Sequence, residues 1–330
     1  MKKFKFSKEK LAKEKIENGL HYEAHQLIKS IINRKLQKNQ ISNCISVIFY
    51  FSLKFATAEQ YVLLCDLMYQ CCLILTQHDI EFNLEYANKI IEIFQKCPPN
   101  STEEKYKFMN KSILWSKSEE NVYGYLEFHK VIGYAYFEDK QYSLAHNHFI
   151  YLDDNDILYE IICLWRKEAY PSESHFFVLR TILCLLVLDK FDQALNLINM
   201  FETNLNRQDV PLPIQLAYLI TSSCIYKSLA LYEDVKYKYR LILNYDPDFQ
   251  KYINIIDAAV FNKKKHNLFK ENSQLVYEYQ REREQERRKQ MRFEINLDRK
   301  GNNQNKQLMN KKVNNKNFNT NPKDVSQQNV

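Results

Sequence analysis

The chain has 330 residues, and 45% of them are hydrophobic, which is enough for a large globular core. It contains only four glycines, too few for a phosphate-binding loop, a dinucleotide-binding loop, a nucleophile elbow or a fold rich in β-hairpins. The net charge of +7 combines basic ends with an acidic body: residues 1–50 carry +7, residues 51–250 carry −9 and residues 251–330 carry +9. These counts favour an all-helical protein whose basic ends attract acidic partners.

The first predicted elements are two helices within residues 8–32. The first helix is basic, and the second is amphipathic because apolar residues recur on one stripe. This stripe consists of Leu20, Ala24, Leu27, Ile28 and Ile31. We interpret the basic residues as a partner-binding surface, with a solvated, frayed terminus as the alternative.

Helical spacing of apolar and aromatic residues continues to about residue 262, and the breaks contain proline. Proline cannot continue a helix but is favoured in its first turn, so each break should end one helix or open the next. The clearest breaks are Cys97-Pro98-Pro99-Asn100, Tyr170-Pro171-Ser172, Pro211-Leu212-Pro213 and Asp246-Pro247-Asp248. No stretch shows convincing strand alternation, although a short hairpin in a connection would escape this test.

A weak repeat consists of a bulky residue, two others, alanine, three others and an apolar residue. It occurs at His21/Ala24/Ile28, Leu84/Ala87/Ile91, Tyr142/Ala145/Phe149 and Phe191/Ala194/Ile198. Residues 132–149 match a tetratricopeptide unit, but the alanines are 63, 58 and 49 residues apart, whereas that repeat has about 34 residues. We therefore predict an all-α fold, an irregular α-solenoid of stacked antiparallel helix pairs over residues 1–262.

Residues 212–231 are predicted to form a helix that is apolar on nearly its whole circumference. Its apolar residues are Leu212, Ile214, Leu216, Leu219, Ile220, Ile225, Tyr226, Leu229 and Leu231. Such a helix is buried on several sides, and near the end of a solenoid one side can be a groove for another chain's helix. Plain core burial is the alternative.

Residues 263–330 differ in composition from the rest. Residues 274–295 are rich in Glu, Arg and Gln and are compatible with a solvated, charge-paired helix. Residues 301–330 contain ten Asn and four Gln and almost no apolar residue. We predict a basic, Asn-rich, largely disordered tail.

No group of residues predicts catalysis or metal binding, so we expect a protein without enzymatic activity or cofactor. His21 and His25 are one helical turn apart, but the acidic residue between them is not placed as in a zinc protease. His146 and His148 would point to different sides of a helix. Residues 153–156 lack the glycine and the terminal glutamate of a calcium loop and are interpreted as a turn between helices.

The eight cysteines form no C-x-x-C pair, and several lie in apolar runs, so we expect buried free thiols in a reducing compartment. No hydrophobic segment follows the charged N-terminus, and no uncharged stretch reaches the roughly 20 residues of a membrane span. We therefore expect a cytosolic protein without stable membrane insertion.

The order of several short segments resembles the Golgi-to-ER traffic protein four family, the helical scaffold of the guided-entry pathway for tail-anchored membrane proteins. The resemblance covers roughly residues 15–262, and no single motif is diagnostic. The segments are Pro99-Asn100-Ser101, Phe108, Leu114-Trp115-Ser116, Leu126, His129, Gly133, Gln141-Tyr142, Ala145, His148-Phe149, Ser172-Glu173, Phe177-Val178, Leu183, Tyr245-Asp246-Pro247, Tyr252, Ile256 and Phe261.

This resemblance implies a non-enzymatic adaptor. In the family, the N-terminal half binds the cytosolic targeting ATPase that carries tail-anchored proteins. The C-terminal half holds the N-terminal segment of a ubiquitin-like-domain protein, and in animals a BAG-family scaffold joins the complex. Such an adaptor raises the effective concentration of ATPase and client co-chaperone for each other.

The family roles imply two sets of site residues in this chain. The residues expected to meet the ATPase are Lys10, Lys13, Lys15, Tyr22, His25 and Lys29. The residues expected to form the groove for the ubiquitin-like partner are Leu216, Leu219, Ile220, Tyr226, Phe249, Tyr252 and Ile256. No small-molecule substrate is expected.

A helical-repeat protein that binds nucleic acid through the basic tail is the alternative from another class. The acidic body and the few aromatic residues among the tail's basic residues argue against it. An unrecognised hydrolase is a third possibility, but no constellation of residues supports it.

Overall fold

The computed structural model describes residues 8–203 and 210–261, and these ranges contain fifteen α-helices, a π-helical turn and no strand. The helices up to residue 149 are α1 (Lys8–Glu17), α2 (His21–Gln37), α3 (Ile41–Thr57), α4 (Tyr61–Gln77), α5 (Leu84–Gln95), α6 (Glu104–Trp115), α7 (Leu126–Glu138) and α8 (Tyr142–Phe149). The later elements are α9 (Asn155–Lys167), α10 (Ser174–Val187), α11 (Phe191–Glu202), α12 (Leu212–Ile225), α13 (Leu229–Lys238), α14 (Arg240–Leu243), α15 (Pro247–Ile256) and the π-helical turn η1 (Asp257–Phe261). The predicted tail, residues 263–330, lies outside the described residues.

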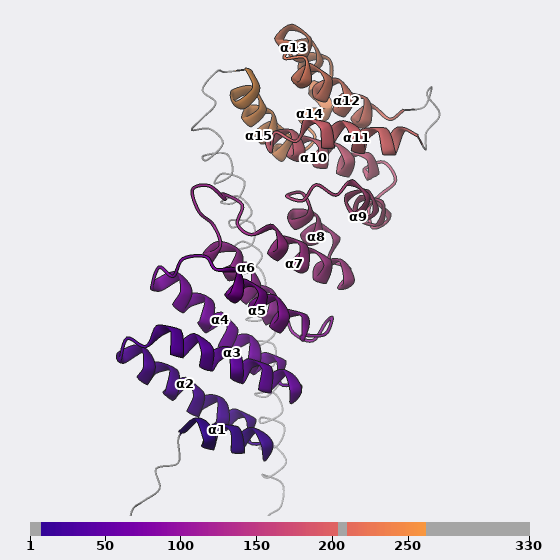
Figure 1. Cartoon of the computed structure of the whole chain (residues 1–330). Helices are drawn as coiled ribbons and strands as arrows, with labels where there is room; N and C mark the ends of the chain where they lie inside the picture. Colours follow the sequence, from indigo (N-terminus) through magenta and orange to yellow (C-terminus); the bar gives the residue numbers. More distant parts are fainter. Residues whose placement is uncertain (1–7, 204–209, 262–330) are drawn as a thin grey trace, which may run out of the picture. The chain divides into compact units, whose positions relative to one another are not determined.

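From α1 to α9, helices pack mainly against their neighbours in sequence (Figure 1). α1 contacts α2, α2 contacts α3, α3 contacts α4, and the series continues from α6 through α7 and α8 to α9. α5 interrupts it, because α4 packs directly on α6 while α5 lies against α3, α6 and α7. The predicted all-α, irregularly stacked fold is confirmed.

Small residues allow the helices of this stack to approach closely. The repeated alanines Ala24, Ala87, Ala145 and Ala194 are all fully buried. Gly133 of α7 lies against Phe149 of α8, where an added Cβ would come within 2.7 Å of the buried aromatic ring. The repeat seen in the sequence therefore marks helix–helix contacts.

The C-terminal helices depart from sequential packing. α10 contacts α9, α11 and α12, and it also contacts α15, which follows some 60 residues later in the chain. Pro247 is the first residue of α15, and the side chain of Asp246 caps this helix by accepting a hydrogen bond from the Asp248 amide at 2.9 Å. The Asp246-Pro247-Asp248 break thus starts the helix that returns to α10.

Most helix ends in the stack do not use glycine. Seven helices in the described ranges end in a Schellman motif. In each, a residue of positive φ and the residue after it donate backbone hydrogen bonds to carbonyls of the last helical turn. Glycine is the preferred residue there, but only Gly19 fulfils this preference. The other six positions are Asn39, Glu59, Asp79, Lys140, Asp189 and Lys227. The low glycine count therefore reflects left-handed helix ends made by polar residues.

Replacing Glu59 by glycine is expected to stabilise the protein by about 1 kcal/mol, because an L-residue at φ 57° is strained and glycine is not. Urea unfolding measures the change. Glu92→Gly, at an exposed position inside α5, is the matched control and should lose about 1 kcal/mol. A loss at both positions would contradict the assigned strain.

A buried ion pair joins α6 to the end of α7. Lys105 Nζ lies 3.3 Å from Asp139, and the two side chains are only 2% and 3% exposed. Asp139 also accepts hydrogen bonds from the Asn100 amide at 3.0 Å and from the Tyr106 hydroxyl. Lys105 also donates to the Pro98 carbonyl. This network ties the proline break at residues 97–100 to two helices.

Histidines form a second buried polar cluster between α7, α8 and α10. His129 Nε2 lies 3.0 Å from the Tyr123 carbonyl, so this nitrogen carries the hydrogen, and its Nδ1 accepts from His148 Nδ1 at 3.1 Å. Thr181 donates to the Phe177 carbonyl, so it accepts from His146 Nε2 at 3.0 Å. The first arrangement requires a neutral His129, because its Nδ1 accepts a hydrogen bond. As expected from the sequence, His146 and His148 face different neighbours.

Candidate binding surfaces

The N-terminal surface consists of α1 and α2, and several of the predicted lysines there are paired with acids. Lys13 pairs with Glu17 on α1 at 3.8 Å, and Lys15 pairs with Glu23 on α2. Lys29 reaches Asp66 of α4 at 2.6 Å, whereas Lys10 is exposed on α1. The charge of these three paired lysines is thus partly compensated within the chain.

His25 was predicted to contact a partner, but the structure buries it. Its side chain is 5% exposed, its Nε2 lies 2.9 Å from Asp66, and its ring meets Phe55 edge-on. Burial lowers the pKa of His25 below its ordinary value. His25 belongs to the buried face of α2 and offers no exposed contact in this structure, so its role in ATPase binding stays a prediction.

The solvent-facing side of α2 carries the predicted residues Tyr22 and Lys29 together with residues that sequence reasoning missed. Tyr22 is 69% exposed at its start. A shallow hollow follows, lined by Gln26, Lys29, Ser30, Asn33, Arg34 and Gln37. Arg34 and Lys38 form no ion pair with a carboxylate of the described residues. The helical spacing of the polar residues that line the hollow, away from the buried residues of α2, is the signal that could have identified this face.

The predicted C-terminal groove is largely core. Leu216, Ile220, Phe249 and Ile256 are at most 1% exposed, so the prediction that they line an open groove is wrong. They face neighbouring helices because α12 and α15 both pack on α10.

The other three predicted groove residues differ in exposure. Leu219 and Tyr252 are both half-buried, and Tyr252 lies near Cys184 of α10. Burial raises the pKa of Tyr252. Only Tyr226, which is 79% exposed, has the accessibility that a contact residue needs.

The predicted helix over residues 212–231 is two helices. α12 ends at Ile225, and Lys227 adopts φ 50° with the two backbone bonds of a Schellman motif before α13 begins at Leu229. The break escaped sequence analysis because its left-handed residue is lysine. Tyr226 and Leu229, on either side of this break, are 79% and 53% exposed.

Exposed apolar side chains concentrate on and around α13. This helix buries only Tyr232 and Val235. The exposed large apolar residues of this region are Leu212, Tyr218, Ile225, Tyr226, Leu229, Leu231, Tyr237, Leu241 and Tyr245. We call Tyr226, Leu229, Tyr237 and Leu241, which are 53–79% exposed, the α13 surface. An apolar concentration of this kind is typical of a protein-binding site.

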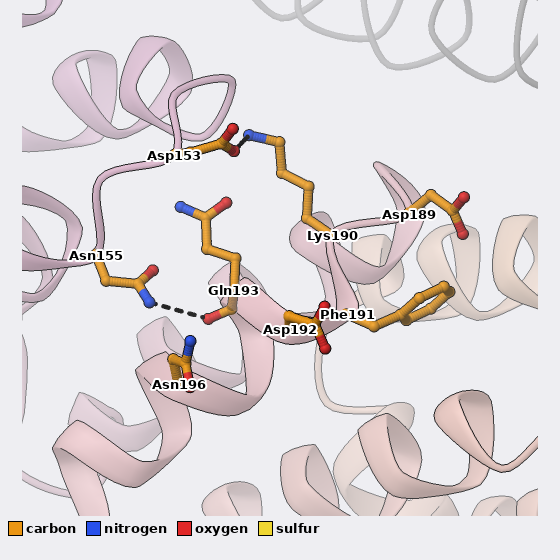
Figure 2. Close-up of a pocket in the computed structure, with 8 residues that line it drawn as sticks. All are labelled: Asp153, Asn155, Asp189, Lys190, Phe191, Asp192, Gln193 and Asn196. Carbon is orange, nitrogen blue, oxygen red and sulfur yellow. Dashed lines mark hydrogen bonds and ion pairs between the residues drawn. The ribbon is translucent and has the colours of Figure 1, made fainter.

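A polar hollow lies between the turn before α9 and the start of α11, and hydrogen bonds within the chain cross it (Figure 2). Lys190 points at Asp153 at 2.7 Å and also donates to the Tyr151 and Leu152 carbonyls. Asp154 caps α9 by accepting from the Ile157 amide. Asp153 and Asp154 thus lie in the predicted turn between helices, whereas Asn155 and Asp156 already belong to α9. Lys190 holds this turn through its three hydrogen bonds.

The described residues contain no group of three His, Cys, Asp or Glu placed to hold a metal. All eight cysteines are free thiols, six of them buried, as the sequence predicted. In the parts of the chain that the structure describes, no helix combines the length and apolarity needed to cross a membrane.

The described chain is an all-α stack with a polar face on α2 and an exposed apolar surface around α13, which is the architecture of a helical-repeat protein. Residues 38–274 match the family described as Golgi to ER traffic protein 4. The chain belongs to this family, as its segment order indicated.

Relatives and a solved structure agree with this assignment. A Golgi to ER traffic protein 4 homolog of Dictyostelium discoideum is 25% identical over 249 residues, covering 75% of this chain and 80% of the relative. The human homolog is 21% identical over 180 residues, 54% of this chain and 55% of the relative. A crystal structure titled C. therm. Get4 superposes with a TM-score of 0.63 at 17% identity, covering 76% of this chain and 87% of the other, which shows a shared fold.

Proposed function

We propose that the protein is a non-enzymatic cytosolic adaptor of the pathway that delivers tail-anchored proteins to the ER membrane. It binds the targeting ATPase through α1 and α2 and a ubiquitin-like-domain protein through the α13 surface, and a BAG-family scaffold is a further candidate partner. Family membership supports the pathway. The observation that carries the two-partner role is the separation of a polar face on α2 from an exposed apolar surface on α13. Co-purification of both partners with the tagged full-length chain tests it.

Replacing Leu229 by aspartate is expected to weaken binding of the ubiquitin-like partner about 30-fold or more, because a carboxylate would be buried in an apolar contact. Binding of the ATPase should not change. Leu84→Asp on α5 is the matched control, since Leu84 is 57% exposed and Leu229 is 53% exposed. Calorimetric titration of each variant measures both affinities, and equal losses for the two variants would rule out the α13 surface.

Reversing Arg34 to glutamate is expected to weaken ATPase binding about 3- to 10-fold at low salt, and less at high salt, because Arg34 forms no ion pair with a described carboxylate. Lys13→Glu should change the affinity less than about twofold, since Glu17 already compensates Lys13. Titrations at two salt concentrations separate the variants. A larger loss of ATPase affinity for Lys13→Glu than for Arg34→Glu would contradict this proposal and favour the lysines of α1 as the contact surface.

Nucleic-acid binding by the basic tail stays a sequence prediction, because residues 263–330 lie outside the described residues. Phosphate binding would give a steep decrease of affinity with salt. A nucleic-acid titration of the full chain therefore separates this alternative from the adaptor.

A further inference from the structure

Arg180 of α10 connects the middle of the C-terminal helices to the start of α15. Its guanidinium donates to Asp248 at 3.0 Å and to Asp246, which are more than sixty residues away in the chain. Asp248 is only 4% exposed, and Asp246 caps α15. The Arg180 side chain thus binds both Asp246 and Asp248, at the start of the helix that packs back on α10.

Aromatic contacts extend this junction along α10. Phe176 stacks on Tyr245 with ring centroids 4.4 Å apart and an interplanar angle of 4°. The Tyr245 hydroxyl donates to Glu173 at 2.9 Å, and the Arg180 guanidinium lies 5.7 Å from the Phe249 ring centroid. We call Glu173, Phe176 and Arg180, together with the residues they contact between 245 and 249, the Arg180 cluster. Because its α10 members are three to four residues apart, they share one face of the helix.

α15 and η1 in turn hold α13. Tyr232, the largest fully buried side chain of the described chain, packs its ring against Phe261 at 4.6 Å, and its hydroxyl lies 3.5 Å from the Ile253 carbonyl. Lys236 pairs with Asp257 at 2.9 Å. Tyr232 and Lys236 are four residues apart and share one face of α13, so α15 and η1 contact this helix along that face.

We propose that Arg180 is a positioning residue for the partner-binding surface of α13 and acts through α15. Without its two ion pairs, the start of α15 is held less firmly on α10, and α13 keeps its packing on α12 but loses the support of α15 and η1. A partner then has to order α13 on binding, which costs affinity. The inference rests on the proposed function, because the α13 surface is taken as the site of the ubiquitin-like protein.

Arg180→Gln is expected to weaken binding of the ubiquitin-like protein at least tenfold and to leave ATPase binding unchanged. Arg180→Lys, which retains the charge but cannot pair with both acids in the same geometry, should give an intermediate loss. Lys236→Gln removes the ion pair between α13 and Asp257 at a partly exposed position and should also reduce the affinity for the ubiquitin-like protein. Arg166→Gln is the matched control, because Arg166 also contacts an aromatic ring, at 5.6 Å, but on α9.

Amide hydrogen exchange of the full-length chain without partner tests the positioning step by itself. Arg180→Gln should accelerate exchange in α13 and α15, but not in α2–α4. Unchanged exchange and affinity in Arg180→Gln would overturn the proposal, as would equal losses for both partners. If Arg180→Gln does not fold, Lys236→Gln decides: unchanged affinity then refutes the proposal. A wild-type chain that binds no ubiquitin-like protein would instead refute the proposed function, and the exchange result would still stand.

Discussion

Replacing Lys105 by methionine is expected to destabilise the protein by about 3–5 kcal/mol, because it leaves the Asp139 carboxylate buried without a counter-charge. The two side chains are 2% and 3% exposed, so water cannot replace the lysine. Methionine has a similar length, which keeps loss of packing small. Urea unfolding at pH 7.5 measures the free energy.

Two variants separate the buried charge from other effects. Lys105→Met combined with Asp139→Asn removes both charges and should lie within about 2 kcal/mol of the wild type. Lys107→Met breaks the exposed pair with Glu104 and should cost less than about 1 kcal/mol. Equal losses for Lys105→Met and Lys107→Met would mean that burial of the Lys105–Asp139 pair is unimportant.

Acidification from pH 7 to pH 4.5 is expected to destabilise the protein by several kcal/mol. Burial lowers the pKa of both His129 and His146 from 6.5 to about 4, and burial also lowers the pKa of His148. The unfolded chain therefore binds more protons in this range. Above pH 6.5 these histidines are neutral in both the folded and the unfolded chain, so the free energy of unfolding is not reduced. As the pH falls from 6.5 towards 4, it decreases by up to about 3 kcal/mol for each of His129 and His146.

Urea unfolding across this pH range tests the assignment to histidines, since most carboxylates titrate at lower pH. His129→Gln should show a shallower dependence between pH 6.5 and 4.5, because an amide can still donate to the Tyr123 carbonyl but does not titrate. His78→Gln, at an exposed histidine, should retain the wild-type slope. Equal slopes in all three proteins would show that buried histidines do not cause the acid sensitivity.

The sequence predicted the stack well where periodicity and proline determine local structure. The all-α fold, the two N-terminal helices, the proline breaks and the burial of Ala24, Ala87, Ala145 and Ala194 are confirmed. These features depend on short-range patterns, which a single sequence displays directly. The family assignment succeeded for a related reason, since it used the order of such segments.

The binding surfaces were harder to predict because they depend on contacts between distant helices. No local signal places α15 on α10, so Phe249 and Ile256 looked as available as Tyr226. His25 neighbours the apolar stripe on α2, and its burial becomes evident only from its contacts with Phe55 and Asp66 on later helices. The left-handed Lys227, which divides residues 212–231 into two helices, has no glycine to mark it.

Simultaneous binding of both partners tests the adaptor role most directly. Size-exclusion chromatography with light scattering would be run on the full-length protein mixed with the targeting ATPase and the ubiquitin-like-domain protein. We expect one species that contains all three proteins, with Leu229→Asp losing only the ubiquitin-like protein and Arg34→Glu weakening only the ATPase. Displacement of one partner by the other would contradict separate binding surfaces, and absence of both from the complex would contradict the adaptor function.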